Sequence, residues 1–97
     1  MARYHVRPMP RLTFTRQLGR FLPVPSVDAP GATVREVLEV AFAREPRLRG
    51  YITDDQGRLR QHVVVFVDGR VIADRVGLGD AVHEASEVHV MQALSGG

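Results

Sequence analysis

The residues best suited to chemistry stand at the end of the sequence, where Gly96 and Gly97 follow Ala93-Leu94-Ser95. Glycine has no Cβ, so this pair can lie extended in a channel too narrow for any other residue. The α-carboxylate of Gly97 has an ordinary pKa of about 3.5 and is ionised near neutral pH. A carboxylate resists nucleophiles until it is activated, usually by acylating a phosphate. A partner enzyme could thread residues 93–97, adenylate Gly97 and pass its acyl group to sulfur or to an amine, although two terminal glycines taken alone are a weak signal.

The remaining reactive side chains do not form a catalytic set. The four histidines are scattered, and none stands at metal-ligand spacing with a second. Ser26, Ser86 and Ser95 lack a base partner of the nucleophile-elbow kind, and the pair Asp54-Asp55 lacks further ligands at regular offsets. Without cysteine the chain has no disulfide, thiolate metal site or thiol catalysis. We expect a carrier that other enzymes act on, with no metal and no cofactor of its own.

Arginine is the only basic residue type, apart from histidine, in this chain. All 13 basic residues are arginines, so no side chain can accept an isopeptide bond. Residues 1–27 contain five arginines and no acid, whereas residues 28–97 contain eight arginines and 11 acids. A basic arm can bind nucleic acid. These arginines are evenly spread, however, so we interpret the arm as a solvated leader and do not expect a nucleic-acid partner.

The length of 97 residues fits one domain. No apolar run approaches the ~20 residues of a membrane span, and no signal-peptide pattern is visible. We expect a cytoplasmic protein without a membrane partner.

The elements that must position the tail follow from hydrophobic periodicity. Thr33 and Glu36 form a capping box before an apolar stripe at helical spacing, and Pro46 ends that helix by about Arg44. Asp68-Gly69 is a two-residue hairpin signal. The expected strands cover residues 11–16, 22–27, 62–67, 70–72 and 87–92, of which 62–67 is apolar enough for a central strand and 22–27 belongs at an edge.

The order of these elements predicts an α+β fold with a helix on one face of a five-stranded sheet, a β-grasp arrangement. We expect an irregular extension over 1–10, the β-grasp domain over 11–92 and a flexible tail over 93–97. Leu48 and Ile52 are expected to pack under the connection after the helix. Leu78 and Val82 are expected to anchor the irregular segment before the last strand.

Three segments resemble the MoaD/ThiS family of ubiquitin-like sulfur carriers: Gln56 to Gly69, the capped helix, and the terminal Ala93 to Gly97. The resemblance implies a ubiquitin-like β-grasp with a mixed sheet. It also implies that an E1-like adenylyltransferase, using ATP and Mg²⁺, activates Gly97 for conversion to a thiocarboxylate. A sulfur-accepting biosynthetic enzyme is then the second partner. Of the family's functional residues, Gly96 and Gly97 carry over. The longer middle loop is more similar to the cysteine-biosynthesis carrier than to the compact molybdopterin-type members.

Strand alternation separates a buried face from a partner face. If Val63, Val65 and Val67 face the helix, the residues between them face away from it. The predicted partner-binding surface comprises Val64, Phe66, His89, Met91 and Leu94. An exposed apolar cluster of this kind usually marks a protein interface.

Two other function classes stay open beside the sulfur carrier. One is a ubiquitin-like modifier that is conjugated through Gly97 to lysines of target proteins. The other is a non-catalytic binding module. All three are compatible with the absence of a catalytic set, and the acceptor of the sulfur is not fixed by the residues.

Overall fold

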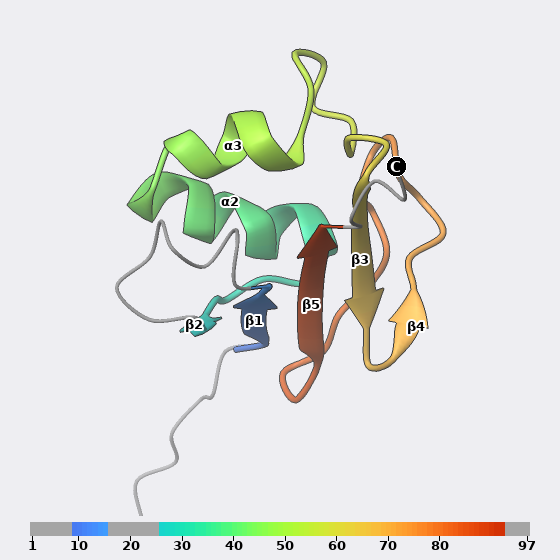
Figure 1. Ribbon diagram of the computed structural model, residues 1–97. Coiled ribbons are helices and arrows are strands. Elements are labelled where there is room, and N and C mark those ends of the chain that lie inside the picture. The colour runs from blue at the N-terminus through green and yellow to red at the C-terminus, as the bar shows by residue number, and fades with distance from the viewer. Residues whose placement is uncertain (1–8, 16–25, 93–97) are drawn as a thin grey trace, which may run out of the picture.

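The computed structural model describes residues 9–15 and 26–92 of the chain. They form a five-stranded sheet with two helices packed on one face (Figure 1). The elements in chain order are β1 (Arg11–Phe14), β2 (Ser26–Asp28), α2 (Val34–Arg44), α3 (Arg47–Ile52), β3 (Val63–Val67), β4 (Arg70–Val71) and β5 (Glu87–Gln92). Within the described residues, no helix is long and apolar enough to cross a membrane.

The sheet is mixed, which confirms the predicted β-grasp fold class. Its strand order is β2-β1-β5-β3-β4, with β1 and β5 parallel and the other neighbours antiparallel. β2 lies at an edge, as the prolines of its segment predicted. β3 has a neighbour on each side, as predicted for an apolar run, but β5 holds the centre of the sheet. The last strand of the domain is therefore held by both halves of the sheet.

Helix α2 begins and ends where the sequence predicted. The Thr33 side chain accepts a hydrogen bond from the Glu36 amide at 3.3 Å. The Glu36 carboxylate reaches back one residue further than in the usual capping box, because it accepts from the Ala32 amide at 2.6 Å. The helix buries its predicted apolar stripe, which comprises Val34, Val37, Leu38, Ala41 and Phe42.

Helix α3 was not predicted, since the sequence analysis placed its residues in a connection. Pro46 does end α2, but it also stands as the N-cap of this second, six-residue helix. Leu48 and Ile52 are fully buried, as predicted, and they are the two core contacts of α3. A short helix with Gly50 inside has weak propensity of its own, so tertiary packing stabilises it.

The predicted register of the sheet is confirmed by burial. Val63 and Val65 of β3 and Val88 and Val90 of β5 are fully buried under the helices. Val67 is only partly buried, because it lies at the end of β3 next to the turn. Leu12 and Phe14 of β1 complete the core, as expected, and Leu78 and Val82 anchor the irregular segment before β5.

The hairpin between β3 and β4 has the predicted two-residue turn. Asp68 and Gly69 have φ angles of 51° and 83°, as a type I′ turn requires at both central positions. β4 is shorter than expected and ends at Val71, while β2 is described only from Ser26. The predicted turn at 17–20, the start of the second strand, most of the extension 1–10 and the tail 93–97 lie outside the described residues.

Candidate functional site

The outer face of β3 and β5 gathers four of the five predicted surface residues. Val64 lies opposite Met91, and Phe66 lies opposite His89. Side chains of directly opposed residues stand on the same face of a sheet. Met91 is 43% exposed, His89 is exposed, and Val64 and Phe66 are half-buried. Leu94, the fifth predicted residue, lies outside the described residues.

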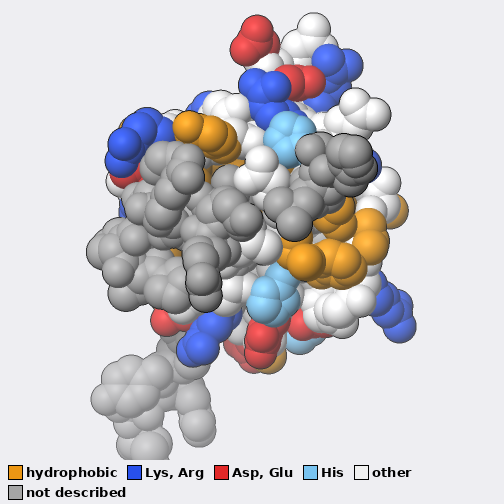
Figure 2. Space-filling view, in the orientation of Figure 1, with side chains coloured by type: hydrophobic (Ala, Val, Ile, Leu, Met, Phe, Trp, Pro, Cys, Tyr) orange, Lys and Arg blue, Asp and Glu red, His pale blue; other side chains and the backbone are white. Residues whose placement is uncertain are grey.

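Val71 belongs to the same surface and was missed in the sequence analysis. It lies opposite Phe66 across the β3–β4 pair and is 57% exposed. The two-residue turn at Asp68-Gly69 already places residue 71 opposite residue 66, so this signal was available. We call Val64, Phe66, Val71, His89 and Met91 the outer patch. Figure 2 shows hydrophobic side chains gathered over β3 and β4, with histidine side chains at the border.

The outer patch is bounded on the β1 side by polar contacts. Thr13 pairs with His89 across the parallel strands, and its hydroxyl hydrogen-bonds Nδ1 of that histidine. Nε2 of His89 lies 3.9 Å from a carboxylate oxygen of Glu87. His89 is thus oriented by its neighbours, and the apolar part of the patch extends from Met91 toward β4.

The residue that precedes the tail is held in the sheet by the terminal residue pair of β3 and β5. Gln92, the final residue of β5, lies opposite Val63, the first residue of β3. The tail begins directly after Gln92, at this end of the sheet. Five residues can span at most about 18 Å when extended. Residues 93–97 lie outside the described residues, so the structure places Gln92, the residue before the tail, and the outer patch beside it.

A cluster of polar groups follows the C-terminal end of β3, and its hydrogen bonds have a structural role. Ser86 is buried; its hydroxyl donates to Asp68 at 3.0 Å and accepts from the His83 amide at 2.9 Å. Asp68 also accepts from the Glu87 amide at 2.9 Å. These hydrogen bonds, that from Glu87 first, hold the pKa of Asp68 below its usual range. Since Ser86 donates to Asp68 and not to the His83 ring, the cluster ties the hairpin turn to the start of β5.

The described residues contain no group of three or more His, Asp or Glu side chains placed to hold a metal ion. Asp54, singled out with Asp55 in the sequence, accepts from the amides of Gln56 and Arg58 and pairs with the Arg58 side chain at 2.9 Å. The Asp54 carboxylate therefore stabilises the loop that contains it.

The sequence matches a family model, and the fold matches several solved structures. Residues 15–97 match the ThiS family. Among curated proteins none matches the sequence significantly. The chain matched in the crystal structure of the Amycolatopsis orientalis BexX/CysO complex is 22% identical with a TM-score of 0.79, over 90% of this chain and 98% of that one.

Two further structures agree with this fold. SAMP1 from Haloferax volcanii is 24% identical with a TM-score of 0.77, over 90% of this chain and 97% of that one. CysO from Mycobacterium tuberculosis is 21% identical with a TM-score of 0.76, over 87% and 98%. At these identities the likeness shows the β-grasp, ubiquitin-like fold.

Proposed function

The chain belongs to the ThiS family, and from this premise we propose that it is a sulfur carrier protein whose reactive group is the carboxylate of Gly97. The observation that carries the proposal is the tail itself. Small residues ending in Gly96-Gly97 follow directly on the central strand of a ubiquitin-like fold. β5 has a strand on each side, so Gln92, the residue that precedes the tail, is held at one end of the sheet.

The chemistry of the carrier needs two partners. On an E1-like adenylyltransferase that uses ATP and Mg²⁺, a carboxylate oxygen of Gly97 attacks the α-phosphorus of ATP and displaces pyrophosphate. Hydrosulfide then attacks the acyl carbon and displaces AMP, which leaves a thiocarboxylate. On a biosynthetic enzyme the thiocarboxylate sulfur bonds to an acceptor in the synthesis of cysteine, molybdopterin or another sulfur-containing metabolite. Water then cleaves the acyl–sulfur bond and restores the carboxylate.

We propose that the outer patch, with Leu94 beyond it, docks the activating enzyme. The support is that Val71 and Met91 are exposed on the outer face beside the half-buried Phe66, and that Met91 directly precedes Gln92, the last residue before the tail. Aromatic and methionine side chains such as Phe66 and Met91 are enriched at protein interfaces. Docking there would orient the domain while the tail enters the enzyme.

An ATP–pyrophosphate exchange assay with the E1-like enzyme of the same organism tests the proposal. The full-length chain should support exchange, and a chain lacking Gly97 should not. The melting temperature of the shortened chain should stay that of the full chain, because the deletion removes no core side chain. Unchanged exchange by the shortened chain would overturn the carrier role.

A protein modifier is the second candidate, because the fold is shared with SAMP1, a small archaeal modifier protein. It would use the same activated carboxylate, with a lysine amine of a target in place of sulfur. A plain binding module would need neither ATP nor a free Gly97 carboxylate. The products at Gly97 therefore separate the three candidates.

A further inference from the structure

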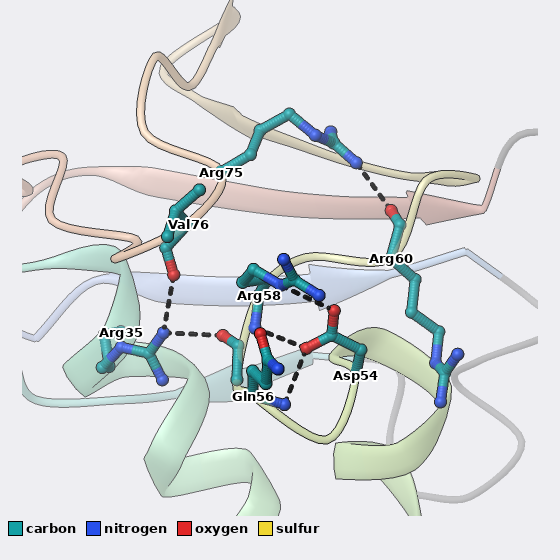
Figure 3. Close-up of polar contacts among 8 residues, drawn as sticks. Arg35, Asp54, Gln56, Arg58, Arg60, Arg75 and Val76 are labelled. Carbon is teal, nitrogen blue, oxygen red and sulfur yellow. Dashed lines mark hydrogen bonds and ion pairs between the residues drawn. The ribbon is translucent and has the colours of Figure 1, made fainter.

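The loops before β3 and before β5 form a basic pocket that the carrier chemistry does not use. Its walls include Arg58, Arg60 and Arg75, with Asp54 as the acidic member. We call it the arginine pocket. Figure 3 shows that these arginines come from two segments that are distant in sequence: Arg75 reaches the Arg60 carbonyl, whereas the Arg60 side chain extends away from it. The lining includes three arginines and one carboxylate, so the pocket carries an excess of positive charge.

Two of these arginines are held by hydrogen bonds to backbone carbonyls, which do not neutralise their charge. Arg75 donates to the carbonyl oxygens of Val63 at 2.9 Å and Arg60 at 2.6 Å. Arg60 donates through Nε to the Gly50 carbonyl at 2.7 Å. Within the described residues these partners are neutral carbonyls, and only Arg58 has a carboxylate, that of Asp54. The hydrogen bonds fix the guanidinium planes and leave donors for an anion.

The pocket lies at the end of the sheet where β3 begins and β5 ends. Arg75 holds the carbonyl of Val63, and Val63 is the residue paired with Gln92 at the end of β5. Arg60 precedes β3 by two residues. An enzyme that surrounds the residues just after Gln92 would therefore also lie near Arg60 and Arg75.

The distance along the tail argues against ATP as the anion bound here. An extended tail carries Gly97, and with it the phosphate under attack, up to about 18 Å beyond Gln92. The pocket instead lies near Gln92, the residue that precedes the tail, because Arg75 holds the carbonyl of its pairing partner Val63. Residues 28–97 contain eight arginines and 11 acids, a balance that disfavours a polyanion such as RNA. Arginine forks of fixed orientation suit the carboxylates of Asp and Glu side chains.

We propose that the arginine pocket binds acidic side chains at the rim of the activating enzyme's channel and so guides the tail into it. This inference rests on the proposed carrier function. Charges at an interface rim act mainly on the association rate and on its dependence on salt. The pocket should therefore affect the KM for the carrier and leave the chemical step unchanged.

The test is ATP–pyrophosphate exchange at increasing concentrations of carrier variants. Arg60→Glu should raise the KM for the carrier about tenfold or more in low salt, with kcat unchanged. The effect should shrink as NaCl rises from about 0.01 M to about 0.15 M, which shortens the Debye length from about 30 Å to about 8 Å. Arg60→Lys loses the same bond to Gly50 but keeps the charge, so it should retain most of the wild-type KM.

The matched control is Arg44→Glu, because Arg44 is exposed at the end of α2 that lies away from β3 (Figure 1). Equal KM values for the Arg60→Glu and Arg44→Glu variants, or an effect that salt does not alter, would overturn the pocket but not the carrier role. No exchange with the wild-type chain would overturn both. Binding of a single-stranded RNA oligonucleotide that Arg60→Glu abolishes would assign the pocket to nucleic acid instead.

Discussion

At the scale of single residues, the structure separates residues that hold the fold from residues that are free to meet a partner. Asp68 belongs to the first kind, since its carboxylate accepts hydrogen bonds from Glu87 and Ser86. Phe66 and Met91 belong to the second, since they stand on the outer face without a core role. Each kind has its own test.

The first prediction concerns the carboxylate of Asp68 and pH. Its pKa in the folded state lies below that of the unfolded chain, so the stability that it contributes is present above about pH 4 and is lost as the pH falls through the folded pKa. Asp68→Asn keeps a residue suited to positive φ at this turn. Melting curves should show the variant less stable than wild type at pH 7, with the difference shrinking toward pH 3. A difference that stays constant with pH would contradict this role.

The second prediction concerns the outer patch. Phe66→Ala and Met91→Ala should weaken binding to the activating enzyme about fivefold or more, as truncation of interface anchors does. Their melting temperatures should fall much less than those of core variants. Calorimetric titration of the enzyme with each variant measures the affinity.

Met9 provides the matched control for Met91. It is 44% exposed, against 43% for Met91, but it precedes β1 and stands apart from the outer patch. Met9→Ala should bind as wild type does. If the patch variants bind normally, or if they melt many degrees lower, the docking surface lies elsewhere on the domain.

At the scale of elements, the alternation along β3 assigns neighbouring valines to opposite faces. Val65 is fully buried under α2, whereas Val64 is half-buried on the outer face. Side chains of a strand alternate between the two faces of the sheet, so a shift of one residue in the register would move every side chain to the opposite face. Both faces of β3 are apolar, so the alternation that distinguishes the two faces is clearer on β5, where the buried Val88 and Val90 alternate with the exposed Glu87 and His89.

A pair of substitutions tests that register. An unpaired buried carboxylate costs several kcal/mol, and a domain of this size has about 5–15 kcal/mol of stability in total. Val65→Asp should therefore abolish the cooperative melting transition. Val64→Asp should keep it and weaken docking instead. A native transition in the Val65→Asp variant, observed by circular dichroism, would show that the register is wrong.

At the scale of the whole molecule, periodicity and turn chemistry were enough to predict the order of the five strands and helix α2, and with it the fold class. Thr33, Pro46 and the Asp68-Gly69 turn mark boundaries by local chemistry, so the sequence shows them directly. Helix α3 was not predicted because six residues that include Gly50 have little helical signal apart from their packing.

The arginine pocket could not be predicted for a different reason. Arg75 reaches Arg60 and Val63 only after the loop before β5 has folded back over β3. No spacing along the chain encodes that contact. The outer patch, in contrast, follows from strand alternation, and only Val71 required the hairpin register in addition.

The central claim is that the carboxylate of Gly97 becomes a thiocarboxylate, and the intact mass of the chain tests it most directly. The chain should be expressed with its native activating and sulfur-supplying enzymes and measured by mass spectrometry. We predict a gain equal to the exchange of one oxygen atom for sulfur, located at Gly97 by fragmentation and missing from a chain without Gly97. An unmodified chain beside an active adenylating enzyme, or Gly97 found only in bonds to lysines of other proteins, would contradict the account.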